Sequence, residues 1–157
     1  MSKQHNYTLT LKWTGNKGTG TSNYKEYERS HSILINNKPE ILGSSDTAFR
    51  GDNTKHNPED FLLASVSSCH MLWYLHLCAD ADIVVTNYID NPTGILVEPV
   101  NAPGHFSQIT LNPVVTITNP NLQDKAKQLH AKAHQMCFIA NSVNFPVNHN
   151  PTIIAVQ

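Results

Sequence analysis

The 157-residue chain is 39% hydrophobic, carries a net charge of −1 and has a sequence pI near 6.7, which fits one compact domain over residues 1–157. It holds no cluster of basic residues that could follow a phosphate backbone, which argues against a nucleic-acid partner. The longest apolar run is broken by serines, histidines and a cysteine, and the first residues lack a signal-peptide core. We therefore expect no membrane segment and a cytoplasmic location.

The first third of the chain predicts strands and a long loop. Apolar and polar residues alternate strictly over 7–13, which is typical of a half-buried strand, and a second long strand is predicted over 28–35. A short strand is expected at 40–42. Residues 43–56 then form a loop whose length in a small domain favours a functional role.

A long helix over 57–79 is the central feature of the sequence. Asn57 is a favoured N-cap, Pro58 suits the first helical position, and Glu59 with Asp60 complements the helix dipole. The apolar residues that follow surround most of the helix, which predicts a buried helix. One chain with a single further amphipathic helix offers too little cover for it, so we expect a homodimer.

Strand patterns resume after this helix. Strands are predicted at 83–90 and 95–100, joined as a hairpin by the turn residues 91–94. A longer strand follows over 106–118, and Pro113 within it predicts an edge or a bulge at that point.

A second, amphipathic helix is predicted from Asn119-Pro120 to about Met136. A further helical turn over 138–143 and a closing strand over 152–156 complete the chain. Strands and helices come in blocks, which predicts an α+β fold of mainly antiparallel sheets packed on two main helices, one of them central and buried.

The three cysteines are expected to be reduced thiols, because their number is odd and the chain carries no export signal. Cys69 and Cys78 lie on opposite faces of the central helix, about 13 Å apart, too far for a disulfide. Cys78 is interpreted as a packing residue. Cys69 and Cys137 lie on different elements and are free to meet, either as a redox pair or as buried bystanders.

A reactive thiolate inside an apolar helix needs a cation beside it, because burial otherwise raises the thiol pKa. Arg50, on the loop before the helix, is the first candidate and Arg29 the second. Glu59 could orient the arginine, although it could equally be an ordinary acid at a helix N-terminus. Glu59 and Cys69 are about 15 Å apart along the helix. The arginine must therefore span that distance, or the glutamate comes from a partner chain.

The histidines offer an alternative reading. His130, His134 and Cys137 fall at i, i+4 and i+7 of the second helix, a zinc-compatible set, although such a pattern is more often a solvated face. His70 points about 100° away from Cys69 and is expected to pack or hydrogen-bond. No nucleotide-binding glycine pattern is present, so we expect neither a cofactor nor a catalytic metal. The alternative function is a non-enzymatic protein that binds zinc or a small ligand.

Three segments together resemble the OsmC/Ohr family, the osmotically inducible and organic hydroperoxide resistance proteins. They are residues 57–64 (NPEDFLLA), 67–71 (SSCHM) and 134–143 (HQMCFIANSV). The Cys-Phe-Ile-Ala segment at Cys137 differs from the Cys-Pro of better-characterised members, which indicates an OsmC-like subgroup.

The resemblance implies an intertwined homodimer with sites at the subunit interface and a thiol-dependent peroxidase that reduces organic hydroperoxides. By the same resemblance Cys69 corresponds to the peroxidatic cysteine, Cys137 to the resolving cysteine, and Glu59 to the carboxylate that positions an arginine, here Arg50. The reductant would be an external dithiol of the lipoyl or thioredoxin type. Apolar helix residues such as Phe61, Leu72 and Trp73 are expected to line the peroxide pocket.

Overall fold

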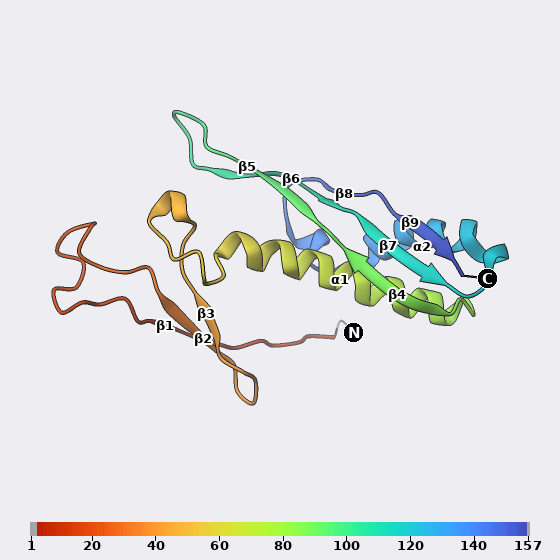
Figure 1. Ribbon diagram of the computed structural model, residues 1–157, viewed down its shortest axis with the longest axis horizontal. Helices are drawn as coiled ribbons and strands as arrows, with labels where there is room; N and C mark the ends of the chain where they lie inside the picture. The colour runs from red at the N-terminus through yellow and green to blue at the C-terminus, as the bar shows by residue number, and fades with distance from the viewer. Residues whose placement is uncertain (1–2, 157) are drawn as a thin grey trace. The chain divides into compact units, whose positions relative to one another are not determined.

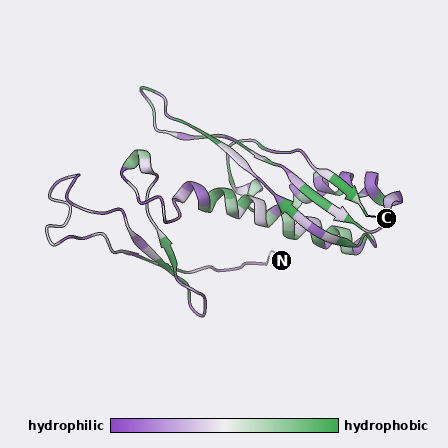
Figure 2. Cartoon of the chain, viewed as in Figure 1, coloured by the Kyte–Doolittle hydropathy of each residue, from purple (hydrophilic) through white to green (hydrophobic). Residues whose placement is uncertain are grey.

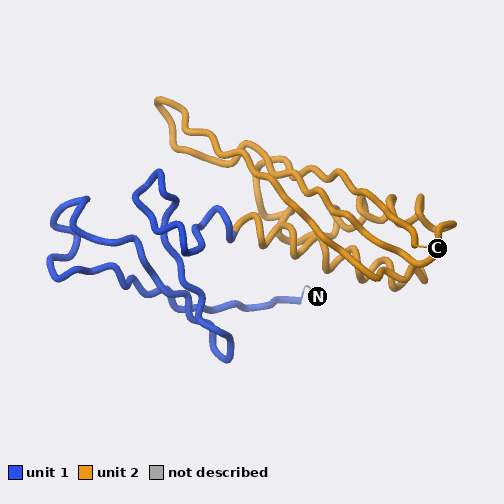
Figure 3. Tube along the Cα trace, in the orientation of Figure 1, with its two compact units in different colours: residues 1–61 blue, residues 62–157 orange. Residues whose placement is uncertain are grey.

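The computed structural model describes residues 3–156 and divides into two compact units, residues 1–61 and residues 62–157 (Figure 3). The boundary falls in the first turn of helix α1 (Pro58–Asp80). Each unit has its own strands. The single domain expected over residues 1–157 stays a prediction.

The first unit holds a three-stranded antiparallel sheet of β1 (Thr10–Trp13), β2 (His31–Leu34) and β3 (Ile41–Gly43), in that order (Figure 1). All three predicted strands are therefore confirmed, although β1 and β2 are shorter than expected. The predicted half-burial of the first strand is wrong for the single chain, since β1 is exposed throughout. Alternation in a sequence indicates that one face is to be covered, but not which chain covers it.

The predicted N-cap of α1 is confirmed. The Asp60 N–H donates to Asn57 Oδ1 at 2.7 Å, and the Asn57 N–H donates to Asp60 Oδ2 at 3.2 Å, a reciprocal pair of the capping-box kind. At the other end the Ile83 N–H donates to the Cys78 carbonyl at 2.9 Å, while Asp82 takes a left-handed conformation (φ 56°) that ends the helix.

Burial on α1 is confined to one side of the helix. The buried residues are Val66, His70, Tyr74, Leu77 and Cys78. Leu72 is 63% exposed, so the burial expected on all sides is not provided by one chain. By length and composition alone α1 could cross a membrane, a test that buried core helices also pass. Figure 2 shows hydrophobic residues along most of this helix, whereas the second helix is largely hydrophilic.

The strands after α1 form one long bent hairpin. Strands β4 (Val85–Asp90) and β5 (Thr93–Val97) run on from one another, as do β6 (His105–Leu111) and β7 (Pro113–Ile117). β5 pairs with β6 and β4 pairs with β7, both antiparallel.

The predicted hairpin over 83–100 is therefore wrong, and the chain reverses instead between β5 and β6. The two long strands, β4–β5 and β6–β7, are joined by hydrogen bonds at the point where each one bends. The Asn112 N–H donates to Asp90 Oδ1 at 2.7 Å, and Asn112 Nδ2 donates to the Asn91 carbonyl at 3.0 Å. Pro113 is not at a sheet edge, because β7 is central, but it opens the strand, where a missing N–H is tolerated.

The last third of the chain carries the second helix. A short 3-10 turn (Pro120–Leu122) leads into α2 (Gln123–Met136), and another (Ala140–Ser142) follows it, as predicted. Strand β8 (Val147–His149) was not expected, whereas β9 (Thr152–Ala155) confirms the closing strand. β8 and β9 run parallel to β6 and β7, while every other strand pair is antiparallel.

Two apolar clusters form the core of the second unit. One joins α1 and α2 to strand β7 and contains Tyr74, Leu77, Cys78, Ile83, Val115, Ile117, Ala126 and Ala133. The other joins the first half of α1 to β6 and β8 and contains Val66, Ile109, Leu111 and Val147. Both helices are thereby fixed on the sheets, which holds the middle of α1 beside the C-terminal end of α2.

Candidate active site

The fold brings Cys69 and Cys137 together. Cys69 lies in the middle of α1 and is partly exposed, whereas Cys137 follows the last turn of α2 and is fully buried. Both are free thiols. Burial, and after it the hydrogen bond and the electrostatic interaction with Cys69, raise the pKa of Cys137 to about 11. Cys137 therefore keeps its proton near neutral pH.

A tight turn surrounds the Cys137 sulfur. We call residues 137–142 the Cys137 turn. The Ala140 N–H donates to Cys137 Sγ at 3.4 Å, and the Ile139 amide also acts to lower the pKa of this thiol. The Asn141 N–H and Asn141 Nδ2 both donate to the Cys137 carbonyl at 3.0 Å. The position of the sulfur relative to these amides is therefore well defined.

An apolar surface lies next to the thiol pair. Leu72, Trp73 and His76 follow Cys69 at i+3, i+4 and i+7, which places them on the same face of α1, and they line a hollow of about 210 Å³. The edge of Phe138 meets Trp73, with ring centroids 5.7 Å apart and planes at 82°. Leu72 and Trp73 were expected to line the pocket. Phe61 belongs to the first unit and is not part of this hollow.

Arg50 lies in the first unit, on a loop whose conformation is fixed by the backbone. It follows the 3-10 turn Thr47–Phe49, which Asp46 caps through a 2.7 Å bond from the Ala48 N–H. Arg50 adopts a left-handed conformation, with φ 65°. The Gly51 N–H donates to the Asp46 carbonyl at 2.9 Å, and a Cβ at Gly51 would lie 1.5 Å from the Ser45 carbonyl oxygen. The loop therefore requires glycine directly after Arg50.

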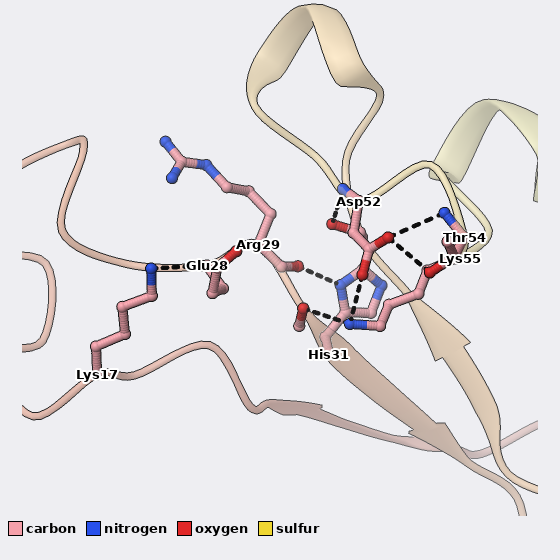
Figure 4. Close-up of polar contacts among 9 residues, drawn as sticks. Lys17, Glu28, Arg29, His31, Asp52, Thr54 and Lys55 are labelled. Carbon is pink, nitrogen blue, oxygen red and sulfur yellow. Dashed lines mark hydrogen bonds and ion pairs between the residues drawn. The ribbon is translucent and has the colours of Figure 1, made fainter.

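Arg29, the second candidate, is already bound within its own segment. Its guanidinium donates to the carbonyls of Tyr27 at 2.5 Å and Tyr24 at 2.8 Å, and lies 4.2–4.3 Å from the centres of both tyrosine rings. In Figure 4 its side chain points away from the Asp52–Lys55 ion pair. These contacts favour Arg50 over Arg29 as the arginine available to a thiolate.

Glu59 lies in the first turn of α1, and its Oε2 atom is buried without a hydrogen-bond partner. Within residues 3–156 no ion pair joins it to an arginine, so the structure does not bring Glu59 and Arg50 together. A buried carboxylate oxygen without a hydrogen-bond donor is energetically costly. Arg50 and Cys69 lie in different units, so their approach remains a prediction.

The histidines of α2 are not a solvated face. His130 is fully buried, and its Nδ1 lies 3.0 Å from Nε2 of His70, which confirms that His70 hydrogen-bonds. His134 and His149 lie beside this pair, with His149 5.7 Å from His70 between ring centres and 5.6 Å from His134. Across the described residues, no group of three His, Cys, Asp or Glu side chains is arranged to hold a metal ion.

The sequence reading missed this cluster of four histidines. Its signal was the helical spacing, since His70 is four residues from both Val66 and Tyr74, which are core positions of α1. Burial, followed by the neighbouring histidines, lowers the pKa of His70 to about 4 and that of His130 to about 3.

The chain has an α+β fold in which two free cysteines meet, one on each main helix or directly after it. These features are typical of a class of proteins that work through thiols. A family model described as OsmC-like protein matches residues 51–152, so the chain belongs to the OsmC-like family, as the sequence motifs indicated. A search of the curated proteins found no match.

Solved structures show the same fold. An OsmC-like protein of unknown function from Vibrio cholerae is 27% identical, with a TM-score of 0.84, and the alignment covers 94% of this chain and 99% of that one. An organic hydroperoxide resistance protein from Elizabethkingia anophelis is 18% identical, with a TM-score of 0.66 and coverage of 98% and 100%. An organic hydroperoxide resistance protein OsmC from Legionella pneumophila is 18% identical, with a TM-score of 0.64 and coverage of 96% and 99%.

Proposed function

We propose that this protein is a thiol-dependent peroxidase that reduces organic hydroperoxides. The observation that carries the proposal is the meeting of Cys69, partly exposed, with Cys137, buried at the end of α2. Two thiols placed in this way can pass between dithiol and disulfide without unfolding. The names of the structural relatives that are hydroperoxide resistance proteins support the same chemistry.

The roles of the two thiols follow from their surroundings. Because the pKa of Cys137 is raised to about 11, Cys137 keeps its proton, and the partly exposed Cys69 is the thiol that attacks the distal oxygen of ROOH. The O–O bond breaks, the alcohol ROH leaves after taking a proton, and Cys69 becomes a sulfenic acid. The Cys137 sulfur then displaces water from it to give the Cys69–Cys137 disulfide. An external dithiol of the lipoyl or thioredoxin type restores both thiols.

Arg50 is the cation of the proposed site and Glu59 the carboxylate that orients it. A guanidinium supplies donors to both the thiolate and the peroxide, and Glu59 Oε2 still requires a donor. The exposed apolar side chains of β1, together with the exposed Leu72 on α1, suit burial against a second copy of the chain. We therefore place the site in a homodimer, and we keep the cytoplasmic location as a separate proposal. The organic group of the peroxide would lie against Leu72 and Trp73.

The test measures consumption of cumene hydroperoxide with dihydrolipoamide as the reductant, for the wild type and single variants. Cys69→Ser should lose turnover entirely, and Cys137→Ser should lose turnover with the dithiol while still reacting once with peroxide. Cys78→Ala is the matched control, since Cys78 is buried in the core away from the pair and should leave the rate unchanged. Equal rates for wild type and Cys69→Ser would refute the proposed function.

A further inference from the structure

We propose that the Cys137 turn makes Cys137 the leaving thiolate when the Cys69–Cys137 disulfide is reduced, with Asn141 as the residue that positions the turn. The inference rests on the proposed function in taking that disulfide as the catalytic intermediate. It specifies which sulfur the reductant attacks, and it assigns a role to a surface asparagine outside the thiol pair.

Access distinguishes the two sulfurs. Cys137 has no solvent-exposed surface, while Cys69 is partly exposed on α1. Thiol–disulfide exchange needs direct contact between the attacking thiolate and the sulfur that it attacks. Within one chain an incoming dithiol can therefore reach Cys69, whereas it could reach Cys137 only after the end of α2 had opened.

Hydrogen-bond donors distinguish them in the same direction. When Cys69 is attacked, negative charge develops on Cys137 Sγ, the atom to which the Ala140 N–H donates at 3.4 Å. The Ile139 amide also favours the charged form of this sulfur. Amide donors already aimed at an atom that gains charge stabilise it without any reorganisation.

Asn141 holds these amides in place. Its Nδ2 donates to the Gln135 carbonyl at 2.9 Å and to the Cys137 carbonyl at 3.0 Å, and its N–H donates to the same Cys137 carbonyl at 3.0 Å. One exposed side chain thus ties the last turn of α2 to the 3-10 turn that carries the Ala140 N–H. Loss of the side-chain amide would remove two hydrogen bonds, the one to the Gln135 carbonyl and one of the two to the Cys137 carbonyl, and would loosen the turn.

One effect opposes this direction of attack. Burial raises the pKa of Cys137, and a thiol of high pKa is a slow leaving group. Leaving-group effects change exchange rates gradually, whereas a sulfur without accessible surface cannot be attacked at all. Access therefore decides the direction, and the amide donors reduce the cost of that direction.

The reduction of the disulfide proceeds in two thiol–disulfide exchanges. A thiolate of the external dithiol forms a bond to Cys69 Sγ, the Cys69–Cys137 bond breaks, and its electron pair stays on Cys137 Sγ against the Ala140 N–H. Cys137 then takes a proton from water. In the mixed disulfide Cys69 Sγ is bonded to the first sulfur of the reductant. The second thiol of the reductant attacks that first sulfur and releases Cys69 as a thiolate. The protein gains two electrons and the dithiol becomes a disulfide.

The experiment maps the mixed disulfide. The Cys69–Cys137 disulfide is made with diamide, which does not depend on peroxidase activity, and is then treated with excess glutathione, quenched with acid and analysed by peptide mass spectrometry. We expect glutathione on Cys69 and a free thiol at Cys137. Glutathione on Cys137, or failure of diamide to form the disulfide, would overturn the inference.

The role of Asn141 is tested by rate and by pH profile. Asn141→Ala should slow glutathione attack about tenfold, the effect of about one lost hydrogen bond in the transition state. In a Cys69→Ser background it should also raise the pH midpoint of Cys137 ionisation by about one unit, followed by the ultraviolet absorbance of the thiolate, which needs no reagent to reach the buried sulfur. Ser142→Ala is the matched control. It removes the 2.7 Å bond from Ser142 Oγ to the Phe138 carbonyl in the same exposed turn and should change neither value.

Asn141→Ser serves as a second variant in case Asn141→Ala does not fold. Wild-type rates and wild-type midpoints of Cys137 ionisation in the Asn141 variants would refute the role of Asn141. A chain that shows the expected mapping but does not consume hydroperoxide would refute the proposed function alone.

Discussion

Acidification should destabilise this protein through two buried histidines. His70 Nε2 and His130 Nδ1 are 3.0 Å apart, the ring planes differ by only 9° and the ring centres are 5.3 Å apart. These values describe one N–H···N bond lying in line with two nearly coplanar neutral rings. The ring of Tyr74 stacks on His130 with centroids 3.8 Å apart. The unpaired ring nitrogens, His70 Nδ1 and His130 Nε2, are also buried, so an added proton finds no partner there.

The direction of the effect follows from the pKa values. In the folded state the pKa of His70 is lowered to about 4 and that of His130 to about 3, from 6.5. The unfolded chain therefore binds more protons in acid, so the stability that these rings provide is complete above pH 6.5 and is lost as the pH falls below it. For each histidine that stays neutral, the free energy of unfolding falls by about 1.4 kcal/mol for each unit by which the pH falls in that range. For the two histidines together it falls by about 2.7 kcal/mol per unit.

The assay is urea unfolding at pH 7.5, 6.5, 5.5 and 4.5, at one protein concentration, followed by circular dichroism. The wild type should lose about 3–5 kcal/mol between pH 6.5 and 4.5, a large share of the stability of a typical domain. The double variant His70→Gln/His130→Asn keeps an amide hydrogen bond at the same ring positions but does not titrate, and should lose much less. His105→Gln, on the exposed end of β6, is the control and should behave as wild type. A double variant with the wild-type slope would refute this reasoning.

The start of α1 and the exposed first sheet each allow a further test. Asn57→Ala removes the side-chain acceptor of the Asp60 N–H and should lower the free energy of unfolding by about 1 kcal/mol in urea titration, with the exposed Asn53→Ala as control. An unchanged midpoint would contradict the assigned cap. Leu11→Lys places a charge on a side chain that is 63% exposed in one chain, and should raise the dimer dissociation constant at least tenfold in analytical ultracentrifugation. Wild-type self-association in that variant would exclude β1 from the dimer interface.

Local patterns predicted much of this molecule. Asn57-Pro58 marked the start of α1, and the 3.6-residue spacing of apolar side chains marked the amphipathic second helix. Both patterns depend only on residues within a few positions of one another, so they can be recognised without knowledge of the fold. The sequence also placed Cys69 and Cys137 on separate elements that could meet, and their motifs indicated the family.

Other features depended on partners distant in sequence. The hairpin expected over 83–100 failed because Asn112 bonds across to Asp90 and Asn91 and keeps both long strands running. The all-round apolar character of α1 did not reveal which side one chain would bury.

The sequence by itself determined the two main helices, most of the strands and the family, because these are encoded in local spacing and short motifs. Only the tertiary structure decided that Cys137 is the buried thiol and that His130 faces His70 rather than solvent. Burial and pKa depend on what surrounds a side chain in space. Helices α1 and α2 bring those surroundings together from positions about 60 residues apart.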